Sequence, residues 1–146
     1  MTNKVRAIPE GYHTMTPYLV VQDGAQQIEF LKQAFGGTQR YRMDDENGEV
    51  RHAEVLVGNS HVMVAQERGE WKAKPASFYL YTEDCDAWYK SALAAGATST
   101  QEPTDHAYGD RSAGVKDGNG NDWWIATHVE DVTSEEMERR MKAGQK

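Results

Sequence analysis

The sequence of 146 residues contains a single cysteine, Cys85. One thiol excludes an intrachain disulfide and any zinc site built from several cysteines. Long apolar runs are missing as well, since no stretch approaches the roughly 20 residues that a helix needs to cross a bilayer. Residues 1–10 lack the apolar segment that a secretory signal contains. Together these absences predict a cytoplasmic protein, in keeping with a reducing compartment.

Positive charge is also scarce. Lysine and arginine number 16 against 23 aspartate and glutamate residues, which gives a formal net charge of −7. Binding to nucleic acid or to an anionic membrane needs clustered cations, so the composition argues against both partners. The one basic concentration, Arg139, Arg140 and Lys142, is interleaved with acidic residues and is typical of a solvated helix face.

The chain does contain an internal repeat, in which one sequence pattern occurs twice, about 60 residues apart. An amphipathic run that begins at Asp23 closes at Phe35-Gly36, and a second run that begins at Asp84 closes at Gly96. Gly58-Asn59 and Gly118-Asn119 then each separate two strand-like stretches. A repeat of this length predicts two copies of one supersecondary unit, with the functional site in the space that the two copies enclose.

Within each copy the pattern predicts a strand, a helix and three further strands. Asp23 and Asp84 are suited to cap the helices, because a carboxylate accepts from the exposed N–H groups of a first turn. The expected strands cover residues 16–22, 38–44, 50–57 and 61–66 in the first copy, and residues 77–82, 97–101, 111–116 and 122–127 in the second. Glu102–Asp110 is expected to form a loop that leads into a strand.

The predicted fold class is therefore α+β, with two βαβββ units in a single domain over residues 1–146. The units are expected at about residues 14–67 and 76–128, with a polar linker at about 68–75. A C-terminal helix is expected at about residues 133–143, because Thr133 followed by Glu136 is a helix-start signature.

Four segments carry a resemblance to a known family: Ile8–Thr14, His52-Ala53-Glu54, Tyr108-Gly109-Asp110-Arg111 and Ala126–Val132. With the two βαβββ units, they resemble the vicinal oxygen chelate superfamily of glyoxalases, bleomycin-resistance proteins and extradiol dioxygenases, and its PhnB-like branch in particular. The resemblance implies that the sheets curl into a cup with the helices outside and a small-molecule ligand inside. It also implies a homodimer, whose units are exchanged between subunits in many relatives.

In metal-dependent relatives, His and Glu side chains on the first and fourth strands of each unit hold the cation. Laid on that pattern, the four positions fall on Thr16, Met63, Ser77 and Trp124, none of which is a His, Glu or Asp. A thioether and an indole are poor ligands for a hard or borderline cation. We therefore expect no cofactor and no standard metal site. The alternative is a divalent cation held by a non-standard set drawn from His13, His52, Glu54 and His61.

The candidate substrate-binding residues lie on the strand faces that should line the cup, and in the loop beside it. They are Tyr18, His52, Glu54, Met63, Tyr79, Tyr81, Tyr108, Arg111 and Trp124. Rings with polar tips suit a flat, partly apolar molecule, and a guanidinium suits a carboxylate or phosphate. Each group also has a structural alternative: His52 and Glu54 as ion-pair partners of Arg40 or Arg42, the rings as core, and Arg111 as a carboxylate partner that fixes its loop.

Two functions follow from these features. The first is a metal-free small-molecule-binding protein, and the acidic charge would favour cationic guests. The second is a divalent-metal-dependent lyase, isomerase or dioxygenase that uses the non-standard ligands. No catalytic residue can be assigned from the sequence, and the choice between a binding protein and an enzyme stays open at this point.

Overall fold

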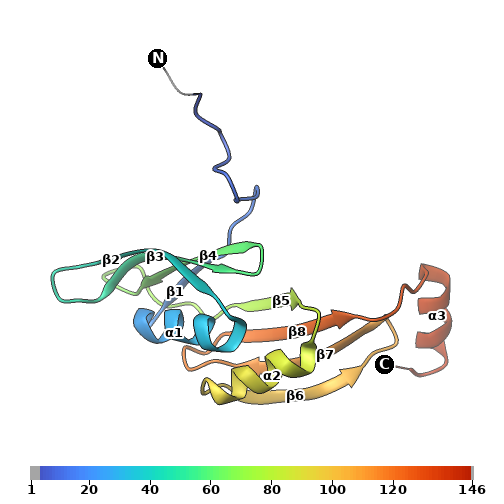
Figure 1. Cartoon of the computed structure of the whole chain (residues 1–146). Coiled ribbons are helices and arrows are strands. Elements are labelled where there is room, and N and C mark those ends of the chain that lie inside the picture. The colour runs from blue at the N-terminus through green and yellow to red at the C-terminus, as the bar shows by residue number, and fades with distance from the viewer. Residues whose placement is uncertain (1–3, 146) are drawn as a thin grey trace. The chain divides into compact units, whose positions relative to one another are not determined.

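The computed structural model describes residues 4–145. The described residues up to Pro75 form one compact unit, and those from Ala76 onward form a second. The first unit contains, in chain order, β1 (Tyr18–Val21), α1 (Gly24–Phe35), β2 (Thr38–Asp44), β3 (Val50–Val57) and β4 (Ser60–Gln66) (Figure 1). The second contains β5 (Ser77–Tyr81), α2 (Cys85–Ala94), β6 (Thr98–Asp105), β7 (Asp110–Lys116), β8 (Asp122–His128) and α3 (Ser134–Lys142).

Each unit has one four-stranded mixed sheet of the same topology. The strand order is β1-β4-β3-β2 in the first and β5-β8-β7-β6 in the second. The first strand of each unit pairs in parallel with the fourth, and the other neighbours pair antiparallel. The parallel pair requires a crossover connection, and this connection begins with α1 in the first unit and α2 in the second, which lead the chain to the far edge strand, β2 or β6. The predicted α+β class with two βαβββ units is therefore confirmed.

Helices α1 and α2 begin in the same way. The side chains of Asp23 and Asp84 accept hydrogen bonds from the backbone N–H groups of Gln26 and Ala87, three residues further on. A side chain from the end of the fourth strand also accepts from the first helical N–H group. Gln66 accepts from Gly24 at 3.2 Å, and Thr127 accepts from Cys85 at 2.9 Å.

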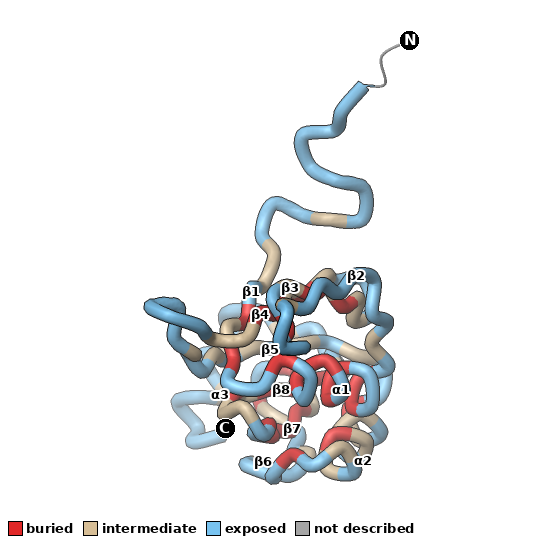
Figure 2. The backbone as a smooth tube through the Cα atoms, turned by 90° about the vertical axis from the view of Figure 1, so that its left-hand side faces the viewer, coloured by how far each residue is buried: buried red, intermediate tan, exposed pale blue. Residues whose placement is uncertain are grey.

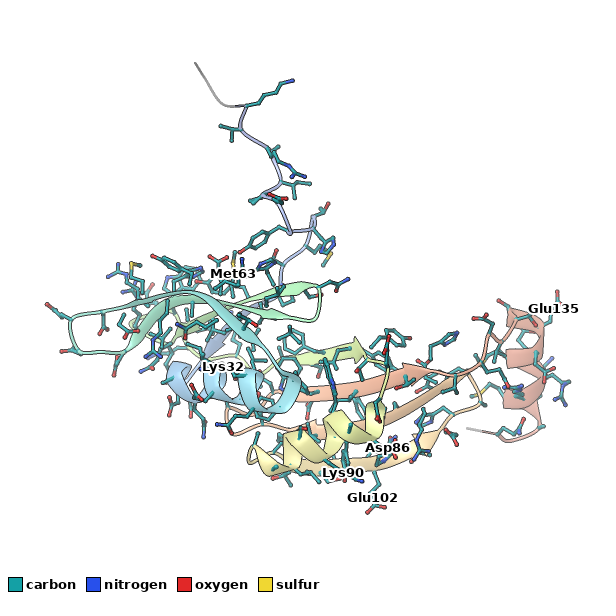
Figure 3. All side chains as sticks on the ribbon, in the orientation of Figure 1. Lys32, Met63, Asp86, Lys90, Glu102 and Glu135 are labelled. Carbon is teal, nitrogen blue, oxygen red and sulfur yellow. The ribbon has the colours of Figure 1, made fainter. Side chains whose placement is uncertain are left out.

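The core of each unit lies between its helix and one face of its sheet (Figure 2). In the first unit, side chains such as Leu19, Ile28 and Val55 are buried there, and Val115 and Ile125 are buried in the second. Met63 projects from the sheet face opposite α1 (Figure 3). Tyr18 lies beside Met63 in register, so that face carries the side chains predicted to bind a ligand.

One sequence-based expectation about the elements was wrong. Glu102–Asp110 was expected to form a loop, but its first four residues, Glu102–Asp105, are the second half of β6. A proline interrupts a central strand because it has no N–H group, but an edge strand tolerates it. β6 is the edge strand of its sheet, and its register shifts between Gln101 and Thr104.

The C-terminal helix α3 follows β8 at the end of that strand (Figure 1). Thr133 caps it by accepting from the N–H group of Glu136 at 3.1 Å. Arg139 and Arg140 donate to the Glu136 carboxylate and lower its pKa to about 2. Arg140 also donates to the backbone oxygen of Ala107, which attaches α3 to the loop before β7. None of the described helices is both long and apolar enough to cross a membrane.

Candidate functional site

The second unit holds a hydrogen-bonded cluster centred on the carboxylate of Asp110, which is only 4% exposed. Tyr79 and Tyr81, both on β5, donate their hydroxyls to the same oxygen at 2.7 and 2.9 Å. His128 Nδ1 lies 2.8 Å from the other oxygen, and its Nε2 lies 2.7 Å from the exposed Asp131. We call these five residues the Asp110 cluster.

Strand order explains why these residues meet. β8 lies between β5 and β7, so the end of β5, the end of β8 and the start of β7 share one edge of the sheet. Asp110 begins β7 directly opposite His128 in the antiparallel ladder. Tyr79 and Tyr81 are two residues apart on one strand and therefore point to the same face. The centroids of their rings lie 5.4 Å apart.

Next to this cluster lies a hollow of about 250 Å³, which we call the aromatic hollow. Its lining residues are Tyr79, Gln101, His106, Tyr108, Ser112 and Trp124. The rings of His106 and Tyr108 are stacked with centroids 5.0 Å apart. Gln101 is held by His106 Nε2 at 3.1 Å and by the backbone oxygen of Ser112 at 3.2 Å.

Gly114 positions the Trp124 ring that forms one side of the aromatic hollow. Gly114 lies opposite Trp124 in the β7–β8 ladder. A Cβ atom at Gly114 would come within 2.8 Å of the Trp124 ring and within 2.5 Å of Thr100 Oγ1. Only a glycine therefore lets the indole lie against the β7 backbone.

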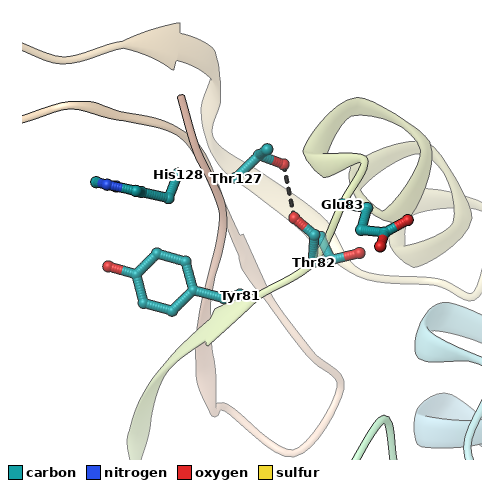
Figure 4. A pocket seen from close by; sticks show the side chains of 5 residues that line it. All are labelled: Tyr81, Thr82, Glu83, Thr127 and His128. Carbon is teal, nitrogen blue, oxygen red and sulfur yellow. Dashed lines mark hydrogen bonds between the residues drawn. The ribbon is translucent and has the colours of Figure 1, made fainter. Parts of the chain in front are cut away.

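A second hollow, of about 530 Å³, lies where β5 and β8 end (Figure 4). We call it the strand-end hollow, and its lining residues are Tyr81, Thr82, Glu83, Thr127 and His128. Figure 4 shows Tyr81 and His128 projecting to one side and Glu83 to the other. Thr127 ties the two chain segments together by donating to the backbone oxygen of Thr82 at 2.9 Å. The Asp110 cluster contributes Tyr79 to the aromatic hollow and Tyr81 and His128 to this one.

The charges of the cluster follow from its contacts. Burial alone would raise the pKa of Asp110, but hydrogen bonds from His128, Tyr79 and Tyr81 hold that pKa below its usual value. The hydrogen bonds to Asp110 and Asp131 raise the pKa of His128. Both of its ring nitrogens face carboxylate oxygens, which only accept, so the imidazolium form fits the site. The pKa of Tyr79 is raised by burial and by its bond to Asp110, so its hydroxyl stays a donor.

The cluster predicts a specific dependence of stability on pH. Because the pKa of Asp110 is lowered on folding, its contribution is present above the usual value of 3.8 and is lost as pH falls through the lowered pKa. Because the pKa of His128 is raised, its contribution is present below 6.5 and is lost as pH rises through the raised pKa. The cluster therefore contributes most between these two values.

We expect His128→Gln to flatten the alkaline decline in the free energy of unfolding. The acid decline should shrink but persist, because Tyr79 and Tyr81 still donate to Asp110. Urea denaturation across the pH range measures both limbs. An unchanged alkaline limb in the variant would show that His128 is not the group responsible.

The first unit places four of the predicted site residues on one sheet face. Glu54 and Met63 are ladder partners, as are Tyr18 and Met63. His52 Nε2 lies 3.2 Å from Glu54, and the rings of Tyr18 and His52 have centroids 5.8 Å apart. The ion pair expected between this pair and an arginine does not form among the described residues, since Arg42 pairs instead with Asp44. The ligand-binding role of these four residues stays a prediction.

The remaining predicted residues belong to the second unit. Tyr79, Tyr108 and Trp124 line the aromatic hollow, and Tyr81 lines the strand-end hollow. Arg111 is instead bound by α2, because its guanidinium donates to both oxygens of Asp86 at 2.8 and 3.0 Å. Asp86 lies on α2 (Figure 3). This is the carboxylate pair that the sequence offered as the structural alternative. The proposed contact of Arg111 with a ligand stays a prediction.

The superfamily that the sequence resembles includes metal-dependent members, whose cation is held by His and Glu side chains. Among residues 4–145, no three His, Cys, Asp or Glu side chains are grouped to hold a metal ion. Of the alternative ligands, His61 has its Nδ1 atom 3.1 Å from the backbone oxygen of Gly11, and its ring stacks on that of Tyr12. His52 and Glu54 bond to each other. This donor set does not fit a catalytic cation, and we derive no step through one.

Sequence reasoning missed Asp110, His128 and Asp131 as site residues. All three lie in the segments Tyr108–Arg111 and Ala126–Val132, from which the sequence analysis drew only Tyr108 and Arg111 as candidate ligand contacts. Gln101 and Ser112 were also missed. Both side chains are polar, and nothing in the neighbouring sequence shows that they lie next to aromatic rings. That proximity depends on how the strands pair.

The chain is similar to known proteins over most of its length. Residues 12–125 match the sequence profile of the Glyoxalase/Bleomycin resistance protein/Dioxygenase superfamily. An uncharacterised protein of Mycobacterium bovis is 31% identical over 140 residues, which cover 88% of this chain and 92% of that protein.

Solved structures have the same fold. TioX from Micromonospora sp. ML1 superposes with a TM-score of 0.70 at 24% identity, over 80% of this chain and 99% of TioX. A superfamily member from Sphaerobacter thermophilus gives a TM-score of 0.62 at 20% identity, over 79% and 96% of the two chains. The profile match and the mycobacterial relative show that the chain belongs to the glyoxalase/bleomycin resistance protein/dioxygenase superfamily.

Proposed function

We propose that the chain is a small-molecule-binding protein that takes a planar, partly aromatic ligand in the aromatic hollow, without a standard metal site. The observation that carries this proposal is the lining of that hollow, where four rings and the polar side chains of Gln101 and Ser112 surround about 250 Å³. Pockets for small molecules combine apolar and aromatic walls with a few polar groups that fix orientation. The assignment to the PhnB-like branch belongs to the same proposal and rests on the four sequence segments.

The hydrogen bonds around the hollow support this function because they hold its walls in place. Tyr79 is fixed by Asp110, and Gln101 is fixed by His106 and by the Ser112 carbonyl. A pocket whose side chains are already ordered loses less conformational entropy when a ligand binds. The net charge of −7 favours a neutral or cationic guest over an anionic one at this hollow.

The test is a thermal-shift screen of planar aromatic compounds in the presence of a chelator. We expect at least one compound to raise the melting temperature, and Tyr108→Ala to weaken its binding about tenfold or more, because stacking area is lost. Tyr41→Ala is the matched control, since Tyr41 also lies beside a histidine, His52, and has a similar exposed fraction of 48% against 39% for Tyr108.

Two results would contradict the proposal. One is a screen in which no compound stabilises the protein in chelator. The other is stabilisation by zinc, nickel, manganese or iron that is lost in His52→Ala, which would favour the metal-dependent lyase, isomerase or dioxygenase.

A further inference from the structure

The first unit has a hollow of about 220 Å³ that shares no lining residue with the aromatic hollow. It is lined by Tyr18, Val20, Ala65, Gln66, Trp71 and two arginines, Arg51 and Arg68. Within the described part of the chain, neither guanidinium has a hydrogen-bond or ion-pair partner. Two uncompensated cations around one hollow are unexpected in a chain that carries 23 acidic and 16 basic residues.

The arginine at the corresponding sequence position of the second unit has a partner that Arg51 lacks. Arg51 and Arg111 have the same sequence position in their units, since each lies two residues before the ladder alanine, Ala53 or Ala113. Arg111 is bound by Asp86, which stands two residues after the helix cap Asp84. The position two residues after the cap Asp23 is Ala25, which has no carboxylate. Arg51 lines the hollow together with Tyr18 and Val20 instead, and no carboxylate pairs with it among the described residues.

A tight turn positions Arg68 and Trp71, two further residues that line the hollow. Arg68 and Trp71 exchange both backbone hydrogen bonds, each at 2.9 Å, around Gly69, whose φ of +54° suits a glycine. Residues directly opposite each other in such a pair send their side chains to the same face. The turn thus presents a guanidinium and an indole side by side. Trp71 is 71% exposed, although a large apolar ring gains free energy when it is covered.

We propose that this hollow, the arginine hollow, is a binding site for an aromatic carboxylate. The two guanidinium groups supply donors in the planar fork that matches a carboxylate, and such charge-assisted bonds are the stronger kind. Tyr18 and Trp71 supply ring faces for the aromatic part of the ligand. The small side chains of Val20 and Ala65 leave the room that a single ring needs.

Calorimetric titration with benzoate tests this site, with benzamide as the neutral analogue of the same shape. We expect benzoate to bind, benzamide to bind about tenfold more weakly or worse, and benzoate binding to weaken as salt is added. Arg51→Gln and Arg68→Gln should each weaken benzoate binding about tenfold. Their melting temperatures without ligand should stay unchanged, because neither arginine gives up a partner.

Arg40→Gln is the control, since it removes an exposed arginine of β2 in the same unit. Trp71→Ala removes a ring but keeps both arginines. It should weaken benzoate binding and leave any binding of inorganic phosphate unchanged. Equal binding of benzoate and benzamide, no benzoate binding at millimolar concentration, or no effect of either hollow arginine would overturn the proposal. If phosphate bound as tightly as benzoate, the proposal that the ligand is aromatic would be overturned.

Discussion

Gly109→Ala is expected to lower the free energy of unfolding by about 4 kcal/mol, the largest effect of any substitution considered for this chain. Gly109 has a φ of +99°, a conformation that costs alanine about 1–2 kcal/mol. A Cβ atom there would also fall 2.1 Å from the backbone oxygen of Glu130, which is fixed because the Glu130 and Val129 N–H groups both donate to the Gly109 oxygen. A backbone atom cannot rotate away as a side chain can.

Gly96→Ala is the matched control for this prediction. Gly96 has nearly the same φ, +101°, and nothing lies within 4 Å of an added Cβ atom. It should therefore show only the conformational cost of about 1–2 kcal/mol. Urea denaturation of both variants measures the difference, and equal destabilisation would mean that the contact with Glu130 relaxes at no cost.

Asp110→Ala is expected to destabilise the protein by about 3 kcal/mol and to weaken ligand binding in the aromatic hollow. The substitution removes the common acceptor of Tyr79, Tyr81 and His128, and hydrogen bonds to a charged group are among the stronger ones. Tyr79 would then lose the bond that orients it at the edge of the hollow. Chemical denaturation and ligand titration measure the two effects separately.

Asp131→Asn provides the comparison, because Asp131 bonds to the other nitrogen of the same histidine but its side chain is fully exposed. Exposed pairs contribute little, so no measurable loss of stability is expected. If Asp110→Ala cost no more than Asp131→Asn, the cluster would not be a structural centre of the second unit.

Much of the fold could be predicted from the sequence because its signals are local and occur twice. The caps Asp23 and Asp84 fix where the helices begin, and turn residues such as Gly58-Asn59 separate the strands. The strand that contains Pro103 could not be predicted, because the effect of a proline depends on whether its strand lies at the edge of a sheet. That property belongs to the tertiary structure rather than to the local sequence.

The candidate site could be predicted only in part, for a similar reason. Strand alternation identified Tyr79, Tyr81 and Trp124, because side chains two residues apart share a face. It could not connect them to Asp110 and His128, since that cluster joins positions far apart in the chain through strand order. The homodimer and the cytoplasmic location stay predictions.

The central claim is that a planar ligand binds in the aromatic hollow without a metal ion. The most direct test is an NMR titration of the isotopically labelled protein, in chelator, with the strongest compound from the thermal-shift screen. We predict that the largest shifts fall on the Trp124 indole N–H and on the amides of Gln101 and Tyr108. Shifts confined to residues outside the aromatic hollow, or shifts that appear only after a divalent cation is added, would contradict the account.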